Sequence, residues 1–388
     1  MVGNNIIIFV LFGPIRWIFS IINIFIPNDP KLILFGSNRG KNWSDNSKSL
    51  FEHMRKESRI LKPVWISLNR EIIAEIRKDD PSSAVYAFSP KGILTYLKAA
   101  QIFVSHSYMD MCYLPPIRGK KVNYLWHGIP MRKIGHSSPD KRNKKFWRRW
   151  NSVVDRLFLS SYYESRILHD AFRLEDVEII ECGNPRNDWL FKLANEDLGS
   201  SETGVRTILY APTWRITGNG AANNEIPLLH PEFEPSRIEG FLRKIDAKLV
   251  IRPHAALKSP DHDLERIEYV PTEKVADLSQ LFTFADVFVT DYSSAYFDWL
   301  ITGKPVIFSA YDLEEYREKY EFNDKFEEIV AGPIATSPVE IEDAIVRAFG
   351  DPDEYSGIRE EISSMVFGDN RGGACEKIMR IIESEAGL

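Results

Sequence analysis

Short runs of apolar residues alternate with stretches of helical periodicity over most of the chain. Runs of this length, bounded by polar turns, are typical of the buried strands of parallel sheets that are covered by helices. The first series of expected strands comprises Lys31 to Phe35, Pro63 to Ser67, Ile102 to Ser105, Val122 to Trp126, Arg156 to Leu159 and Val177 to Cys182. The second comprises Thr207 to Ala211, Lys248 to Arg252, Ile267 to Val270, Val287 to Thr290 and Pro305 to Ser309. Helices are expected between strands, for example Ser294 to Thr302 and Val339 to Phe349.

A polar stretch from Asn195 to Gly204 separates the two series and is interpreted as a linker. The length of 388 residues also exceeds the roughly 250 to 300 at which single cores stop growing. We therefore expect an α/β fold with an N-terminal Rossmann-like domain over residues 31–194, a C-terminal one over 205–360 and a C-terminal helix over 361–388. Open α/β sheets bind ligands at the carboxyl ends of their strands, so a central cleft between the two sheets is expected.

Residues 1–30 contain an almost wholly apolar segment from Ile6 to Ile26, about as long as the roughly 20 residues of a bilayer-spanning helix. Gly13-Pro14 interrupts the segment and Arg16 lies near its middle, and no secretory cleavage pattern follows. The pattern favours a bent helix or hairpin lying in the cytosolic leaflet. A single span and a buried domain helix are the alternatives.

A basic block from Arg132 to Arg149 follows the fourth expected strand, with Asp140 as its one acidic residue. Such blocks are usually solvated faces, but this one encloses aromatic residues, which suits an anionic membrane surface. The candidate contacts to membrane or acceptor are Arg132, Lys133, Lys144, Lys145, Trp147, Arg148 and Arg149.

Composition excludes several classes of protein. The chain has 49 Lys and Arg against 55 Asp and Glu, a net charge of −6, which argues against a nucleic-acid-binding protein. Its 3 cysteines lack paired spacing, which excludes a disulfide framework and a cysteine-rich zinc site and favours a reducing cytosolic compartment. Asp261-His262-Asp263 superficially matches a metal motif but is expected to be a solvated loop, so no metal or cofactor is assigned. Phosphate-loop, dinucleotide and serine-hydrolase motifs are missing from the sequence.

Candidate catalytic residues follow the expected strands. His127 ends the strand in YLWHGIPMRKIG, where Pro130 suits the first turn of a helix, and its imidazole could take a proton from a hydroxyl near neutral pH. Arg252 and His254 leave another strand in KLVIRPHA, where they could contact phosphate. Each could equally be structural.

A third group of candidates surrounds the start of an expected helix. Asp291 ends a strand, and Ser293 and Ser294 open the helix, where hydroxyls and free N–H groups bind anions. Serines here could also be ordinary helix caps. The turns Asn184 to Asp188 and Pro212 to Arg215 end two further strands and are expected to add polar groups to the same cleft.

These motifs together resemble the CDP-glycerol glycerophosphotransferases that build teichoic acids and related capsule polymers. The matching elements are DNSKSLFEHM, YLWHGIPMRKIG, CGNPRNDWLF, ILYAPTWR, IRPHA, VTDYSSAYFDWLITGKPVIF and GDNRGGACEKI, in the family's order. The resemblance implies a GT-B-like pair of domains, with a CDP-glycerol or CDP-ribitol donor held mainly by the C-terminal one. It also implies a lipid-linked saccharide acceptor at the cytoplasmic face of the bacterial plasma membrane.

The resemblance also implies roles for individual residues. His127 would be the general base on the acceptor hydroxyl, and His254 would assist at the donor pyrophosphate beside Arg252. Asp291, Ser293 and Ser294 would form the donor loop, with Arg215 as a further donor-binding residue. The reaction implied is attack of the hydroxyl on the β-phosphorus with release of CMP. Two alternatives stay open: a GT-B glycosyltransferase that uses a nucleotide sugar, and a non-catalytic envelope-assembly scaffold.

Overall fold

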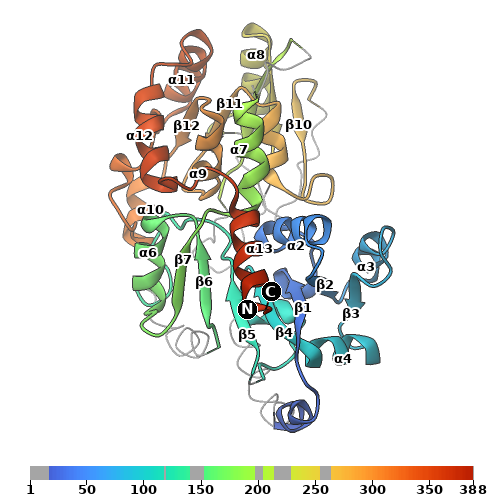
Figure 1. Ribbon diagram of the computed structural model, residues 1–388. Helices are drawn as coiled ribbons and strands as arrows, with labels where there is room; N and C mark the ends of the chain where they lie inside the picture. The colour runs from blue at the N-terminus through green and yellow to red at the C-terminus, as the bar shows by residue number, and fades with distance from the viewer. Residues whose placement is uncertain are drawn as a thin grey trace. The chain divides into compact units, whose positions relative to one another are not determined.

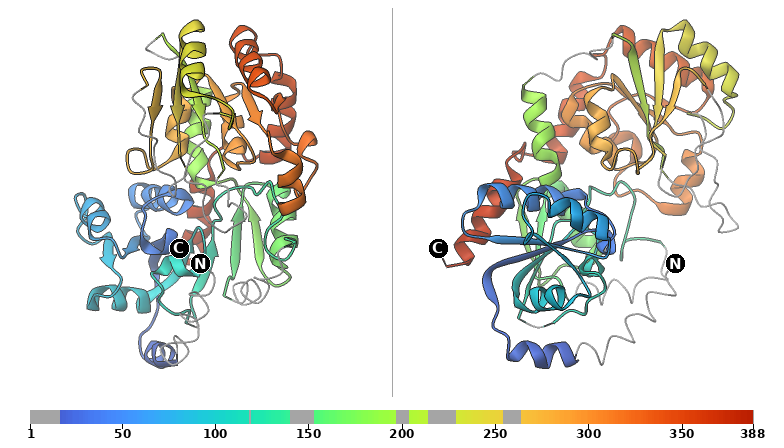
Figure 2. Two further views of the ribbon diagram at one scale, coloured as in Figure 1. Left: turned by 180° about the vertical axis from the view of Figure 1, so that it is seen from behind. Right: turned by 90° about the vertical axis from the view of Figure 1, so that its right-hand side faces the viewer.

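The computed structural model describes residues 17–117, 119–139, 153–196, 204–213, 229–253 and 264–387. The chain divides into two compact units (Figures 1 and 2). Unit 1 comprises Met1–His127, Ile134–Trp189 and Phe367–Leu388, and unit 2 comprises Gly128–Lys133 and Leu190–Val366. Each unit is built on a parallel sheet with helices, which confirms the expected α/β class. The cleft expected between the sheets stays a prediction.

The sheet of unit 1 has 7 strands in the order β3-β2-β1-β4-β5-β6-β7, and all neighbours are parallel. The direction in which strands are added reverses between β1 and β4, which in open α/β sheets is where ligands bind. The strands are β1 (Asp29–Gly36), β2 (Lys62–Ser67), β3 (Ala84–Tyr86), β4 (Ala99–Val104), β5 (Lys121–Tyr124), β6 (Arg156–Leu159) and β7 (Glu178–Glu181).

Both faces of this sheet are buried. Along β1, Leu34 belongs to one apolar cluster, while Ile33 and Phe35 belong to the cluster on the other face. Strands buried on both faces appear in sequence as continuous apolar runs, which is why most of them could be recognised. The helices of unit 1 are α2 (Asp45–Glu57), α3 (Arg70–Ile76), α4 (Pro90–Lys98), α6 (Tyr162–Phe172), the start of α7 (Asp188–Asn195) and α13 (Ala374–Glu385).

The last helix of the chain, α13, returns to unit 1. Ile378 and Ile382 are fully buried in the same cluster as Phe51 of α2. At the start of α13, the Asp188 carboxylate accepts the backbone N–H groups of Ala374 and Cys375 at 2.9 and 2.8 Å. A helix N-terminus needs acceptors for its free N–H groups, and Asp188 supplies them from a part of the chain far away in sequence.

Unit 2 has a second parallel sheet, with its 6 strands in the order β10-β9-β8-β11-β12-β13. Here the reversal lies between β8 and β11. The strands are β8 (Arg206–Tyr210), β9 (Ala247–Ile251), β10 (Ile267–Tyr269), β11 (Val287–Thr290), β12 (Val306–Ser309) and β13 (Ile334–Ala335). The helices are α8 (Pro235–Lys244), α9 (Ala295–Trp299), α10 (Leu313–Tyr320), α11 (Pro338–Gly350) and α12 (Ser356–Phe367).

The structure corrects several of the expected elements. Strand β5 ends at Tyr124, two residues before the expected end, because Trp126 adopts a left-handed backbone with φ of +55°. The expected helix after Pro130 is absent from the described residues 127–139, where the backbone forms turns and irregular structure. The region expected as one C-terminal helix instead holds the end of α12 and the separate α13. Most of the expected linker lies outside the described residues.

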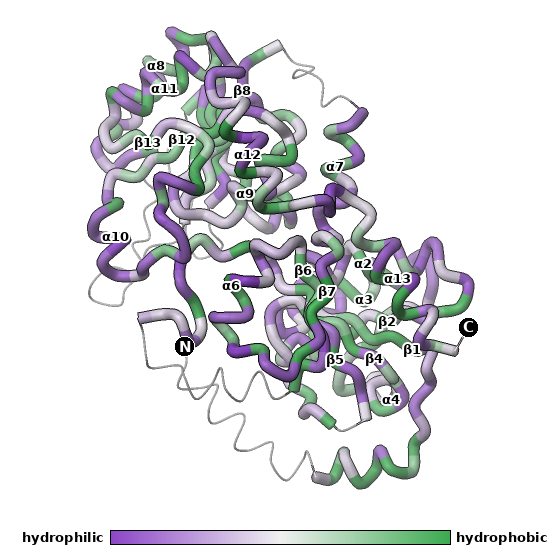
Figure 3. The backbone as a smooth tube through the Cα atoms, turned by 60° about the vertical axis from the view of Figure 1, so that its left-hand side comes forward, coloured by the Kyte–Doolittle hydropathy of each residue, from purple (hydrophilic) through white to green (hydrophobic). Residues whose placement is uncertain are grey.

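In the described part of the N-terminal segment, residues 17–24 form a helix that precedes β1 (Figure 3). Phe19 and Ile26 pack against the core of unit 1, and the Phe19 ring lies 6.3 Å from that of Tyr96 in α4. The other large apolar side chains of this stretch are exposed, with Trp17 at 73%, Ile24 at 77% and Phe25 at 80%. Within the described ranges, no helix is both long and apolar enough to cross a bilayer.

Candidate active site

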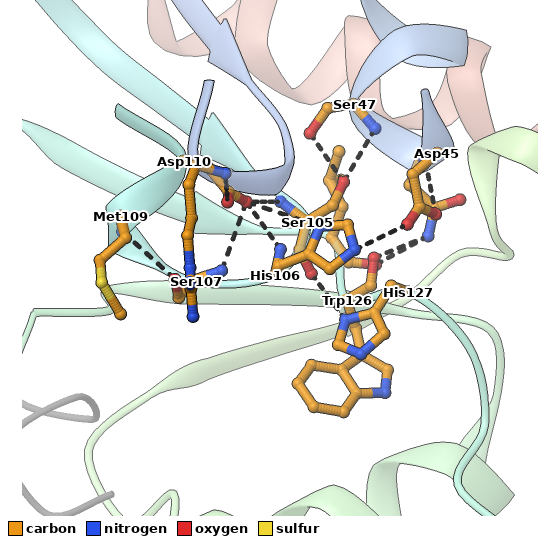
Figure 4. A network of polar contacts seen from close by, with 12 residues as sticks. Asp45, Ser47, Ser105, His106, Ser107, Met109, Asp110, Trp126 and His127 are labelled. Carbon is orange, nitrogen blue, oxygen red and sulfur yellow. Dashed lines mark hydrogen bonds and ion pairs between the residues drawn. The ribbon is translucent and has the colours of Figure 1, made fainter. Parts of the chain in front are cut away.

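The residues around His127 lie at the carboxyl ends of β1, β4 and β5, where the strand order of unit 1 reverses (Figure 4). Trp126, with its left-handed backbone, turns the chain sharply between β5 and His127. Such a conformation is costly for a bulky residue and needs support from its surroundings. The buried Asn46 supplies this support, because its Nδ2 donates to the carbonyl groups of Leu125 and Trp126, each at 3.0 Å.

This turn fixes the orientation of the His127 ring. Its Nδ1 lies 3.0 Å from the carbonyl oxygen of Ser105, the residue that follows β4. A carbonyl can only accept, so this contact assigns the proton of neutral His127 to Nδ1. Nε2 then carries the lone pair. Burial, followed by the nearby His106, lowers the pKa of His127 to about 4, so the ring is unprotonated at neutral pH.

Asp45 and Arg186 form an ion pair beside His127. Arg186 Nη1 donates to Asp45 Oδ1 at 3.0 Å and to the His127 carbonyl at 2.7 Å. The backbone N–H of Arg186 in turn donates to Asn46 Oδ1 at 3.0 Å. Burial alone would raise the pKa of Asp45, but Arg186, the two histidines and the Asn46 N–H hold it below its usual value. Asp45 is therefore a carboxylate, and Arg186 links it to the backbone carbonyl of His127.

Asp110 organises the loop after β4. Its Oδ2 accepts the backbone N–H groups of Ser105, His106 and Ser107, and its Oδ1 accepts that of Arg39 after β1. Burial raises the pKa of Asp110 to about 6, against these donors, which favour the charged form. Gly36, at the end of β1, allows this close approach, since an added Cβ would lie 2.3 Å from the Asp110 carbonyl oxygen.

The carboxyl ends of β8 and β11 in unit 2 are joined through Asp291. Its carboxylate accepts the N–H of Thr213 at 2.9 and 3.0 Å, the Thr213 hydroxyl at 2.9 Å and the N–H of Tyr292 at 2.6 Å. Asp291 is 2% exposed. It therefore fixes two loops at the position where the order of this sheet reverses.

The other candidates in unit 2 have local contacts. The Ser293 hydroxyl accepts the N–H of Ala295 at 3.3 Å, as a helix cap does. Ser294 precedes α9 without a side-chain cap bond. Arg252 is 8% exposed, and its guanidinium donates to the carbonyl groups of residues 270, 271 and 276 at 3.1 to 3.2 Å. Arg252 thus braces its own loop, and phosphate binding by these three residues stays a prediction.

Part of the predicted site lies outside the described residues, namely Arg215, His254, Lys144, Lys145, Trp147, Arg148 and Arg149. Arg132 and Lys133 are described, within unit 2. Lys133 Nζ lies 2.7 Å from Glu321 Oε2, and the Arg132 guanidinium lies 4.8 Å from the centre of the Tyr320 ring. Their contact with a membrane or acceptor stays a prediction. Among the described residues, no group of three or more His, Cys, Asp or Glu could hold a metal ion.

Comparison with known proteins identifies the family. The model for CDP-glycerol:poly(glycerophosphate) glycerophosphotransferases matches residues 18–384. The chain belongs to this family. It is therefore an enzyme of the teichoic acid glycerophosphotransferase and polymerase type, as the motifs indicated.

Curated relatives agree with this assignment, and a solved structure shares the fold. The teichoic acid glycerol-phosphate transferase of Staphylococcus aureus is 28% identical, over 92% of this chain and 94% of its own. The teichoic acid poly(glycerol phosphate) polymerase of Staphylococcus epidermidis is 27% identical over 80% of this chain, which spans only 44% of that longer relative. A variant of the wall teichoic acid polymerase TagF soaked with CDPG has the same fold, with a TM-score of 0.75, 23% identity and coverage of 93% and 90%.

Several residues of the candidate site in this glycerophosphotransferase were not predicted. Asp45 and Asn46 lie within a quoted motif, but no role was assigned to them, and Arg186 was expected only as part of the polar turn Asn184 to Asp188. They meet only through folding, since Asn46 and Arg186 are 140 positions apart. His106 was missed altogether, although it directly follows an expected strand, the criterion by which His127 was chosen. Applied to every strand end, that criterion would have found it.

Proposed function

We propose that this enzyme transfers glycerol phosphate, or a related alditol phosphate, from a CDP-alditol to a hydroxyl of a lipid-linked acceptor in teichoic acid synthesis. The family membership supports the reaction class. The observation that carries the mechanism is the His127–Ser105 contact, because it leaves an unprotonated Nε2 on a rigid turn. An imidazole in this state can accept the proton of an attacking hydroxyl.

In the proposed reaction, the acceptor oxygen bonds to the β-phosphorus of the donor and its proton passes to Nε2 of His127. The bond from the β-phosphorus to the bridging oxygen breaks, and CMP leaves with that oxygen. Phosphoryl transfer depends mainly on positioning and on stabilising charge, so no covalent enzyme intermediate is required. Asp45 and Arg186 hold the turn that carries the base.

The donor is assigned to the ends of β8 and β11. Asp291 fixes the two loops, and Ser293 and Ser294 would contact donor phosphate through their hydroxyl and N–H groups. Arg215, Arg252 and His254 would neutralise the pyrophosphate. Arginine and histidine suit this role because they donate charge-assisted hydrogen bonds to phosphate oxygens.

A donor panel tests the proposed reaction. The purified full-length enzyme would be mixed with CDP-glycerol, CDP-ribitol or a UDP-sugar, with and without a lipid-linked saccharide that carries a terminal glycerol phosphate. We expect acceptor-dependent CMP release from one of the CDP-alditols and a product heavier by one alditol phosphate. UDP release would identify a glycosyltransferase instead. Binding of the acceptor without release of any nucleotide would identify a scaffold.

We further propose that the enzyme acts at the cytoplasmic membrane surface, with the N-terminal segment lying in the interface. The helix over residues 17–24 is anchored to unit 1 by Phe19, which leaves Trp17, Ile24 and Phe25 exposed. Exposed apolar side chains gathered on one short segment indicate a site of interaction. Trp and Phe also suit the membrane interface, and the basic block would add attraction to anionic head groups.

Removing residues 1–25 should abolish salt-resistant binding to anionic liposomes, because salt screens charge contacts but not buried apolar surface. The deletion spares Ile26, and also Asn28, whose side chain bonds Gly119 and Lys120 at 2.7 and 3.2 Å. Liposome sedimentation at low and high salt measures the effect. Tyr162→Ser is the matched control, since Tyr162 is 73% exposed on α6. A truncated protein that still pellets at high salt would place the anchor elsewhere.

A further inference from the structure

A second imidazole lies directly against His127. The rings of His106 and His127 are stacked, with centroids 4.6 Å apart and planes 12° from parallel. His106 belongs to the loop that follows β4, and His127 follows the neighbouring strand β5. The loop is rigid, because Asp110 accepts three successive N–H groups from it and Tyr124 donates its hydroxyl to the His106 carbonyl. His106 therefore forms a fixed wall for the His127 ring.

Two carboxylates flank His106 (Figure 4). Its Nε2 lies 3.6 Å from Asp45 Oδ2, and its Nδ1 lies 3.8 Å from Asp110 Oδ2. Both distances exceed those of hydrogen bonds. The Nδ1 atom of His106 is buried and has no hydrogen-bond partner among the described residues. Neither nitrogen is thus committed to one protonation state. His127, by contrast, has its Nδ1 committed to the Ser105 carbonyl.

Several charged groups act on His106. Burial lowers its pKa, Asp45 opposes this, and Arg186 and Arg39 add to the lowering. His127 and Asp110 are the other titratable groups that face it. Two imidazolium rings stacked at this distance repel each other strongly. Protonation of one ring therefore disfavours protonation of the other. His106, whose Nε2 lies 3.6 Å from the Asp45 carboxylate, is the better place for that proton.

We propose that His106 is a positioning residue for His127. His106 holds the His127 ring parallel to its own, and it takes up the first proton that enters the pair, so that His127 does not. This inference rests on the proposed function, in which His127 is the base. As the medium becomes acidic, His106 is protonated first and His127 keeps its lone pair. The charge on His106 then opposes proton uptake by His127, so the base stays unprotonated to lower pH than it would beside a neutral residue.

Ring resonances of histidine test this proposal without an activity assay. The full-length protein would be labelled with ¹³C at histidine, assigned through single variants, and titrated by two-dimensional NMR. In the wild type, His106 should titrate at higher pH than His127. In His106→Gln, the pKa of His127 should rise by about 1 to 3 units, as expected when a neighbouring like charge is removed. His53→Gln, which alters a histidine paired with Glu376, should leave the titration of His127 unchanged.

A second variant separates charge from stacking. His106→Phe keeps an aromatic ring against His127 but carries no charge, so it should raise the pKa of His127 as His106→Gln does while preserving more turnover. In both variants the acidic limb of kcat should move upward with the pKa. If one variant does not fold, as judged by its melting curve, the other still provides the titration.

The outcomes separate this inference from the proposed function. The role of His106 would be overturned if the pKa of His127 were unchanged in the folded variants. It would also be overturned if His127 titrated at higher pH than His106 in the wild type. A shifted titration in a protein that releases no nucleotide from any donor would overturn the reaction but leave the coupling of the two imidazoles standing. CMP release together with an unshifted His127 titration would support the reaction but overturn the coupling of the two imidazoles.

Discussion

Replacing His127 by alanine should lower turnover at least a hundredfold while the protein stays folded. General-base assistance is typically worth about 10² to 10⁴ in rate, and His127, on the turn after β5, is the imidazole whose Nε2 carries the lone pair. The Asn46 and Arg186 contacts to this turn involve its backbone carbonyl groups and survive the substitution. Acceptor-dependent CMP release at saturating donor measures the loss.

The same assignment fixes a pH dependence. A base must be unprotonated to act, and burial together with His106 holds the pKa of His127 near 4. Wild-type turnover should therefore persist below pH 6.5, the ordinary pKa of histidine. It should fall as the pH approaches the pKa at which the coupled pair of His106 and His127 takes up its second proton. His53→Ala is the matched control, because His53 pairs with Glu376 elsewhere in unit 1. Near-wild-type turnover in folded His127→Ala would refute the base assignment.

The sheets could largely be predicted from sequence for a physical reason. Strands buried on both faces are mainly apolar, so the runs Leu32 to Phe35 in β1, Ile102 to Val104 in β4 and Val287 to Val289 in β11 could be recognised. Strands β3 and β13 were missed, because 3 and 2 residues carry no readable period. The end of β5 was placed too late, because the apolar run continues through Trp126 although its backbone has left the strand.

The site was predictable only where chemistry and strand position coincide. His127 and Asp291 follow apolar runs, and each lies at the carboxyl end of a strand. The groups that hold them come from elsewhere in the chain. Arg186 reaches His127 from a short helical turn 59 positions away, and Thr213 reaches Asp291 across 78. Such pairings depend on which strands become neighbours, and one sequence does not specify that order directly.

Replacing Asp291 by alanine should both destabilise unit 2 and weaken donor binding more than tenfold. The substitution removes the acceptor for the Thr213 N–H, the Thr213 hydroxyl and the Tyr292 N–H in a nearly dry environment. Hydrogen bonds to a buried charge are worth about 1.5 to 3 kcal/mol each, and unpaired buried donors cost a similar amount. The unfolding free energy should fall by about 3 kcal/mol or more, as measured by urea denaturation.

The loss of donor affinity is expected from the position of Asp291 in the sheet, not from the lower stability of the variant. Asp291 fixes the ends of β8 and β11, where the donor is proposed to bind, whereas Asp286 joins the opposite ends of the same strands by accepting the N–H of Thr207 at 2.7 Å. Asp286→Ala should therefore lower stability and leave the affinity for CDP-glycerol, measured by calorimetry, unchanged. If both variants weaken donor binding equally, the effect is general loosening of the sheet. If neither does, the donor does not bind at this end of unit 2.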